Sequence, residues 1–215
     1  MKILIIIPAY NEEKSILKVV ENIQRHFPKA DYIVINDCSK DSTEKVLVEN
    51  GLNHLNLKCN LGIGGGVQSG YKYAVLNGYD IAIQIDGDGQ HDPQYLGRLI
   101  EPIIKGEADM VIGSRFIECE GFQTSFMRRF GIRLLQTLIR ICCGVNITDA
   151  TSGFRATSKD LIKMFAEEYA QDYPEPEAII FGVLNGYRVK EVPVIMHERK
   201  EGKSSINVSK SIYYM

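Results

Sequence analysis

The sequence predicts a single α/β domain built on a mostly parallel, doubly wound sheet with helices on both faces. Through the first two thirds of the chain, short apolar runs rich in β-branched residues alternate with helical patterns. That alternation is typical of parallel sheets covered by helices. Asp, Asn and Gly residues gather just after the apolar runs. Ligands of such sheets bind beyond the carboxyl ends of the strands, so we expect one site at that edge.

The amino-terminal elements follow from apolar patterning. Residues 3–7 are an uninterrupted apolar run and predict a buried strand. Residues 12–27 carry apolar side chains at helical spacing along one stripe and predict a helix. Residues 32–36 predict the second strand, and the polar turn 37–43 leads into a helix that ends near Glu49.

The middle of the chain continues the alternation. Residues 55–58 predict a weak third strand, and the glycine cluster 62–66 forms a turn that opens a helix ending near Asn77. A fourth strand is expected at 81–85. A helix over 93–105 and a fifth strand over 110–113 follow.

The pattern changes after Arg115. Residues 125–143 predict a basic amphipathic helix. One face holds Met127, Phe130, Leu134, Leu138 and Ile141, and the opposite face holds Arg129, Arg133, Gln136 and Arg140. Two interpretations stay open: a helix packed on the domain with a solvated arginine face, or a helix lying at an anionic membrane surface. Residues 145–157 are expected to form a polar loop, and 187–196 a late strand.

Length and composition bound the class of protein. With 215 residues the chain suits one domain, and its net charge of −2 gives no indication of nucleic-acid binding. Five cysteines without a Cys-x-x-Cys pair fit reduced thiols in the cytosol. No apolar stretch approaches the ~20 residues of a membrane span. We expect a cytoplasmic protein, and leave open peripheral membrane contact and assembly as a homo-oligomer.

The acidic turn after the fourth expected strand is the most informative motif. Asp86 and Asp88 stand one glycine apart directly after a buried run. Two such carboxylates repel each other unless a cation lies beside them, and oxygen ligands of this kind suit Mg²⁺ or Mn²⁺. The alternative is a solvated turn, since turns favour Asp and Gly. An EF-hand is excluded, because His91 and Gly97 stand where it requires Gly and Glu.

Six motifs occur in the order seen in family 2 glycosyltransferases. They are Ile-Pro-Ala-Tyr-Asn-Glu-Glu (7–13), Asn-Asp-Cys-Ser-Lys-Asp-Ser-Thr (36–43), Asn-Leu-Gly-Ile-Gly (60–64), Asp-Gly-Asp-Gly-Gln-His-Asp-Pro (86–93), Gly-Ser-Arg (113–115) and Thr-Asp-Ala-Thr-Ser-Gly-Phe-Arg (148–155). The chain especially resembles the dolichyl- or polyprenyl-phosphate mannosyltransferase branch. This resemblance implies a GT-A fold, a nucleotide-sugar donor, Mn²⁺ or Mg²⁺, and inversion at the anomeric carbon. It assigns residues 1–115 to the nucleotide sugar and 116–215 to the acceptor side.

The resemblance also implies roles for single residues on the donor side. The nucleotide sugar would be bound by Pro8, Ala9, Tyr10, Glu12, Asp37, Asn60, Gly64, Gly65, Asp86, Gly87 and Asp88. The metal ligands would be Asp86, Asp88 and Gln90, with His197 as a further candidate and His91 as a turn residue. Two alternatives stay open: Glu12 as a favourable charge at a helix start, and Asp37 as a turn residue or cap of the following helix.

On the acceptor side the resemblance assigns Arg115 and Arg155 to an acceptor phosphate. Arg199, Lys203 and Ser204 match a late basic loop that closes over the donor phosphates. A lipid-phosphate acceptor is already an anion and needs no general base. A saccharide hydroxyl needs one, for which Asp149 and Glu177 are candidates. The donor, a UDP-, GDP- or dTDP-sugar, is left open.

Two other function classes are weighed against this one. A sugar-phosphate nucleotidyltransferase would carry a glycine-rich loop with a basic residue after its first strand, whereas residues 8–13 read Pro-Ala-Tyr-Asn-Glu-Glu. A non-catalytic nucleotide-binding relative is the other class. The intact pair Asp86 and Asp88 counts against it.

Overall fold

The computed structural model describes residues 1–118 and 126–198. Its strands are β1 (Ile3–Ala9), β2 (Asp31–Asn36), β3 (His54–Asn56), β4 (Ile81–Gln84), β5 (Met110–Ser114), β6 (Arg155–Ser158) and β7 (Val189–Pro193). Its helices are α1 (Ile16–His26), α2 (Thr43–Glu49), α3 (Gly62–Leu76), the short 3₁₀ helix η1 (Pro93–Tyr95), α4 (Leu96–Ile104), α5 (Phe126–Cys143), α6 (Lys159–Glu167) and α7 (Pro174–Leu184). Within this part of the chain, no helix is long and apolar enough to cross a membrane.

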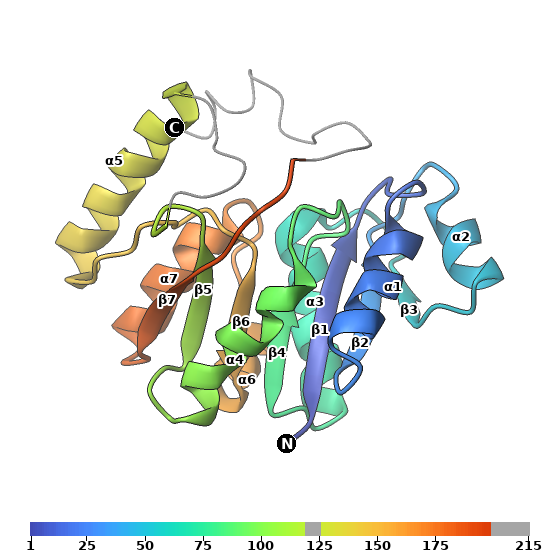
Figure 1. Ribbon diagram of the computed structural model, residues 1–215, viewed down its shortest axis with the longest axis horizontal. Coiled ribbons are helices and arrows are strands. Elements are labelled where there is room, and N and C mark those ends of the chain that lie inside the picture. The colour runs from blue at the N-terminus through green and yellow to red at the C-terminus, as the bar shows by residue number, and fades with distance from the viewer. Residues whose placement is uncertain (119–125, 199–215) are drawn as a thin grey trace.

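The strands form one seven-stranded sheet in the order β3-β2-β1-β4-β6-β5-β7. β1 pairs in parallel with β2 and β4, and β5 pairs in parallel with β7 (Figure 1). Only β6, among the strands described, is antiparallel to both of its neighbours, β4 and β5. The predicted mostly parallel sheet is confirmed.

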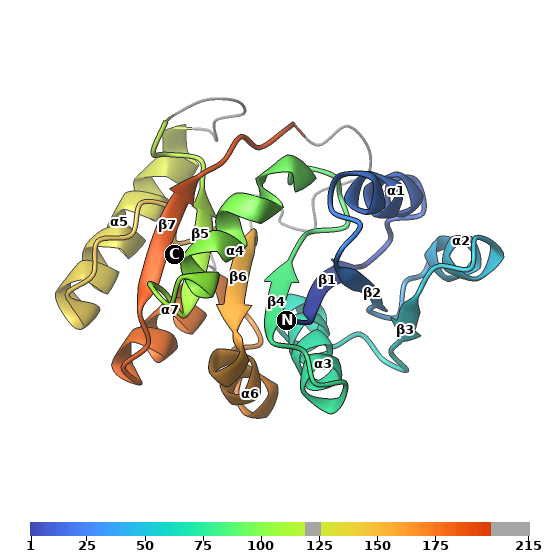
Figure 2. The same ribbon diagram turned by 60° about the horizontal axis from the view of Figure 1, so that its bottom comes forward.

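Helices cover both faces of the sheet, as the sequence predicted. One core, with Ile5 and Ile7 of β1 at its centre, packs the sheet against α1, α2 and α4. The other core, with Leu4 and Ile6, packs it against α3, α6 and α7 (Figure 2). Because side chains of a strand alternate between faces, the uninterrupted apolar run of β1 supplies both cores.

Strand β6 corrects the loop expected over 145–157. Residues 155–158 lie between β4 and β5, with Gln84 paired to Arg155 and Ile112 also opposite Arg155. The segment Arg-Ala-Thr-Ser has no apolar run, so its strand conformation comes from pairing with two buried neighbours rather than from local preference.

Helix α5 lies on the outer side of the sheet near β7 and α7 (Figures 1 and 2). The apolar face that the sequence predicted would pack on the protein is not the face of α5 that is buried. Ile132 and Ile139 are the buried side chains, whereas Leu134, Leu138 and Ile141 are exposed. Gln136, expected on the polar face, is partly buried and donates from Nε2 to the carbonyl oxygen of Thr148. The apolar stripe was visible in the sequence, but a second, shorter stripe packs on the protein.

Candidate active site

The loops expected at one edge of the sheet are joined by hydrogen bonds. The amide of Asp37 donates to the carbonyl oxygen of Ala9 (2.9 Å), and the amide of Gly87 donates to that of Pro8 (3.3 Å). The side-chain amide of Asn60 donates to the carbonyl oxygen of Asp37 (3.0 Å). β1 lies between β2 and β4, so the carboxyl ends of three strands meet here.

Asp37 is buried at the start of α3. Its carboxylate accepts a hydrogen bond from the amide of Leu61 (2.7 Å). Burial raises the pKa of Asp37, and the amides of Leu61 and Gly62 oppose that shift. Asp37 was considered as a cap of the next helix along the chain, α2. In the structure its carboxylate caps the start of α3 instead. Its contact with a nucleotide stays a prediction.

Glu12 is nearly buried in the turn that precedes α1. The expected helix over 12–27 begins at Ile16, after a turn in which the carbonyl oxygen of Glu12 accepts hydrogen bonds from the amides of Ser15 and Ile16. The Glu12 carboxylate accepts a hydrogen bond from the Ser15 hydroxyl (2.7 Å). The backbone amide of Glu12 donates to the Thr43 hydroxyl. Tyr10, two residues earlier, is partly exposed at the same sheet edge.

Gly64 and Gly65 allow a close approach between two parts of the protein. Both lie inside the first turn of α3, which begins at Gly62, rather than in a turn before it. A Cβ atom on Gly64 would lie 2.1 Å from the carbonyl oxygen of Ala170, and one on Gly65 would lie 2.5 Å from Cβ of Leu61. Their expected approach to a ligand stays a prediction, whereas their approach to residues 61 and 170 is a property of the fold.

The acidic turn after β4 is held in shape by its own residues. The amide of Asp86 donates to Nδ1 of His91 (3.1 Å), and Nε2 of His91 lies 3.7 Å from the Asp86 carboxylate. His91 is buried and stacks on Phe154 with ring centroids 4.8 Å apart. The amide of Gln90 donates to the Asp88 carboxylate (3.0 Å). Both carboxylates are thereby fixed at the sheet edge, and both are partly exposed.

The segment after β7 runs alongside this turn. His91 and Met196 form a β-bridge, and the amide of His197 donates to the carbonyl oxygen of Gln90 (2.8 Å). Nε2 of Gln90 donates to the carbonyl oxygen of His197, a bond that does not use the Gln90 side-chain oxygen, and its role as a metal ligand stays a prediction. The His197 ring lies 3.3 Å from Asp92. Arg199, Lys203 and Ser204 lie outside the described residues.

The loop between α5 and β6 closes over Asp86 from the other side. A Cβ atom on Gly153 would lie 3.1 and 3.2 Å from the two carboxylate oxygens of Asp86. It would lie 2.9 Å from Nε2 of the Gln84 side chain. A side chain at this position would force the side chains of Gln84 and Asp86 to shift. The motif Ser152-Gly153-Phe154 therefore packs against the acidic turn.

Arg115 and Asp149 form a two-pronged ion pair at the end of β5. Nε and Nη2 of Arg115 donate to the two carboxylate oxygens of Asp149 (2.7 and 2.8 Å), and the Arg115 amide donates to one of them (3.2 Å). Asp149 is fully buried, whereas Arg115 keeps slight exposure. The candidate base and a candidate phosphate ligand thus bind each other.

Arg155, the other predicted phosphate ligand, is fully buried in β6. Its guanidinium donates to the carbonyl oxygens of Ser152 and Glu175. In this geometry it orders two backbone segments and does not face solvent, and its role at an acceptor phosphate stays a prediction. Glu177, the second candidate base, is exposed on α7 beside a hollow lined by Phe165 and Tyr169.

Glu191 of β7 is a site-shaping residue that the sequence analysis missed. Its carboxylate accepts hydrogen bonds from the amides of Thr148 (2.7 Å) and Asp149 (2.8 Å). Burial raises the pKa of Glu191, and the neighbouring Asp149 carboxylate adds to that shift. A carboxylate within the late strand, in Val-Lys-Glu-Val-Pro, was the available signal.

Comparison with known proteins agrees with this geometry. The family described as "Glycosyl transferase family 2" matches residues 4–165. A UDP-N-acetylglucosamine–dolichyl-phosphate N-acetylglucosaminyltransferase from Methanococcus voltae is 35% identical, over 89% of this chain and 84% of the relative. An undecaprenyl-phosphate mannosyltransferase from Micrococcus luteus is 30% identical, over 96% of this chain and 88% of the relative.

Solved structures show the same fold. Glucosyl-3-phosphoglycerate synthase from Mycobacterium tuberculosis, in complex with phosphoglyceric acid, superposes with a TM-score of 0.73 at 19% identity, covering 94% of this chain and 73% of that one. The same enzyme with Mn²⁺, UDP-glucose and phosphoglyceric acid gives a TM-score of 0.71 at 19% identity, covering 94% of this chain and 72% of that one. The predicted GT-A fold is confirmed. The chain belongs to glycosyltransferase family 2 and is a glycosyltransferase.

Proposed function

We propose that this enzyme transfers a sugar from a nucleotide-sugar donor to a lipid phosphate, with a divalent metal and with inversion at the anomeric carbon. The observation that carries the proposal is the fixed acidic turn, Asp86 to Asp88, hydrogen-bonded to the last residues of β1 at the carboxyl edge of the sheet. The names of the Methanococcus and Micrococcus relatives, both lipid-phosphate sugar transferases, support the acceptor class.

The residues at the acidic turn fit Mg²⁺ or Mn²⁺. These ions are bound by one or two carboxylates together with substrate phosphates and water, rather than by a complete set of protein ligands. Asp86 and Asp88 would supply the carboxylates, with the side-chain oxygen of Gln90 beside them. No cluster of three or more acidic, His or Cys side chains suited to a metal is found among the described residues. When bound, the metal would neutralise the leaving diphosphate.

The protein's own residues would orient the two substrates. Pro8, Ala9 and Asp37 line the edge where the nucleoside part of the donor would lie. Inversion requires the acceptor oxygen to attack the anomeric carbon from the side opposite the diphosphate, so donor and acceptor must approach from different loops. Two segments joined by an ion pair form the candidate acceptor side: the segment after β5, which carries Arg115, and the loop between α5 and β6, which carries Asp149. Arginine suits phosphate recognition because its donors form a planar fork.

The ion pair of Asp149 supports a phosphate acceptor over a sugar hydroxyl. Asp149 is fully buried, and its two oxygens already accept hydrogen bonds from Arg115. A carboxylate engaged in this way is a poor proton acceptor. A lipid phosphate carries a charged oxygen at neutral pH and needs no base, so this arrangement suits it. Asp149 then positions Arg115, which remains the group for the acceptor phosphate.

The metal assignment is tested with Asp88→Asn. The position is in a turn at the sheet edge, so we expect the variant to fold and to lose Mn²⁺-dependent binding of UDP, GDP and dTDP in calorimetry. Asp80→Asn is the matched control, because Asp80 precedes the same strand at its opposite end and pairs with Lys159. If Asp88→Asn binds nucleotide with Mn²⁺ as wild type does, the metal assignment is wrong.

The donor and acceptor are tested separately. A panel of UDP-, GDP- and dTDP-sugars is incubated with the enzyme and Mn²⁺, and release of the nucleoside diphosphate identifies the donor. The chosen donor is then supplied with a short polyprenyl phosphate in detergent micelles or with the matching polyprenol. We expect product only with the phosphate. Transfer to the polyprenol hydroxyl but not to the phosphate would overturn the acceptor class.

A further inference from the structure

Helix α5 exposes an apolar stripe, Leu134, Leu138 and Ile141, which we call the α5 stripe. These side chains are 48%, 48% and 74% exposed. At 100° per residue they fall within a sector of about 60°. Ile132 and Ile139, on the opposite side of the helix, are only 3% and 1% exposed. Among the residues that the structure describes, the helix is thus held to the protein by one side and exposes a second apolar side.

The charges of α5 are all of one sign. Its sequence contains four arginines and neither Asp nor Glu. Arg133 and Arg140 are exposed and project about 100–120° from Leu134, on one flank of the α5 stripe. An apolar stripe beside a basic flank is typical of helices that lie in the interface of an anionic bilayer.

We propose that the α5 stripe inserts into the surface of an anionic lipid bilayer, with Arg133 and Arg140 facing the headgroups. This inference rests on the proposed function, since a lipid-phosphate acceptor resides in such a bilayer. A second copy of the chain fits less well, because it would bring two arginine-rich, acid-free helices together. The stripe itself, and not only the arginines, distinguishes this surface from an ordinary solvated helix face.

The same helix is joined to the candidate acceptor side. Nε2 of Gln136 donates to the carbonyl oxygen of Thr148, and the next residue, Asp149, binds Arg115. A bilayer that contacts the α5 stripe would therefore lie on one side of α5, while Gln136 of the same helix contacts the loop that carries Thr148 and Asp149. This placement lets an acceptor phosphate reach Arg115 while its lipid chain stays in the membrane.

The test is vesicle sedimentation of the full chain with phosphatidylglycerol–phosphatidylcholine vesicles. Replacing Leu134, Leu138 and Ile141 together by Ser should reduce binding at least tenfold, because apolar burial is lost. The loss should persist at high salt. Arg133→Gln with Arg140→Gln should weaken binding about fivefold per arginine at low salt, and much less at high salt. Phosphatidylcholine alone should bind wild type weakly.

A matched triple variant serves as control: Val48, Leu76 and Ile104, exposed apolar residues on other helices, all changed to Ser. It should bind vesicles as wild type does. Donor hydrolysis in solution should be unchanged in every variant, so a failed membrane assay is distinguishable from a failed enzyme assignment. Wild-type vesicle binding by the stripe variant would overturn the proposal. The proposal would also be overturned if analytical ultracentrifugation showed that the wild type is a dimer and the stripe variant a monomer.

Discussion

Glu191 joins β7 to the loop that carries Asp149. It accepts hydrogen bonds from two successive backbone amides, those of Thr148 and Asp149, and from the Thr148 hydroxyl. Asp149 in turn binds Arg115. Glu191 therefore supports the backbone of the residue that binds Arg115, and the orientation of Arg115 depends on it indirectly.

Stability should report the environment of Glu191. Burial raises its pKa above the ordinary value of 4.5. A carboxyl group that holds its proton more tightly when folded adds stability below its unfolded pKa, and this is lost as the pH rises through the folded value. Glu191→Gln should remove that pH-dependent loss, measured by urea unfolding between about pH 4 and pH 7. Because the Gln amide would place a donor against backbone donors, the variant should also lose about 1–3 kcal/mol.

Glu107→Gln is the control for this experiment. Glu107 is exposed, and its hydrogen bond with Lys190 lowers its pKa, so its contribution has the opposite sign and is lost as the pH falls. Its removal should slightly reduce the acid sensitivity of the free energy of unfolding. An identical pH profile for wild type and Glu191→Gln would contradict the buried, proton-favouring environment described for Glu191.

Helix α3 is shaped by glycines that face the protein. Gly64→Ala should destabilise the fold, although alanine favours helices over glycine by about 1 kcal/mol. The added methyl would lie 2.1 Å from a backbone oxygen, that of Ala170, which cannot turn away as a flexible side chain can. Gly97→Ala in α4 meets nothing within 4 Å and should be neutral or stabilising. Thermal melts of the two variants are the measurement, and equal melting temperatures would contradict the contact.

The elements that sequence reasoning found and missed differ in one physical respect. β1, β2 and β4 carry apolar runs that specify a buried strand locally, so they were predicted. β6 reads Arg-Ala-Thr-Ser and is a strand because two neighbours offer it backbone partners. Arg155 was assigned to a phosphate from the family resemblance alone, and nothing in the local sequence shows that its side chain is fully buried and bonded to the backbone of Ser152 and Glu175.

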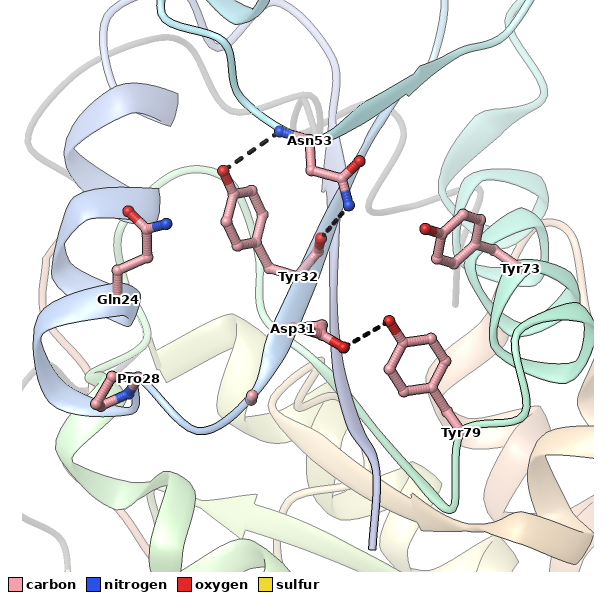
Figure 3. Close-up of a pocket in the computed structure, with 8 residues that line it drawn as sticks. Gln24, Pro28, Asp31, Tyr32, Asn53, Tyr73 and Tyr79 are labelled. Atoms are coloured by element: carbon pink, nitrogen blue, oxygen red, sulfur yellow. Dashed lines mark hydrogen bonds between the residues drawn. The ribbon is translucent and has the colours of Figure 1, made fainter.

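The sheet as a whole separates two edges with different surfaces. Asp37 and Asp86 follow the carboxyl ends of β2 and β4. Asp31 and Tyr79 lie at the amino ends of the same strands, where they line an open hollow and the Tyr79 hydroxyl donates to Asp31 (2.9 Å; Figure 3). The sequence predicted which edge holds the site, because strand direction fixes where each turn falls. The segment after β7 was expected near the acidic turn only from the resemblance, with His197 as a candidate ligand, because local patterns do not show that residues 91 and 196 pair.

Hydrogen exchange should distinguish these two edges. Addition of Mn²⁺ with the nucleoside diphosphate of the identified donor should slow amide exchange in residues 8–12, 60–66 and 86–92, which lie at the carboxyl edge. Exchange in residues 28–31 and 77–80, around the hollow of Figure 3, should not change. Local exchange follows local opening, and a bound ligand suppresses opening where it makes contacts. Protection around Asp31 and Tyr79 with none at 86–92 would place the nucleotide at the wrong edge for the chemistry proposed, because the acidic turn would then be too far away to act on its phosphates.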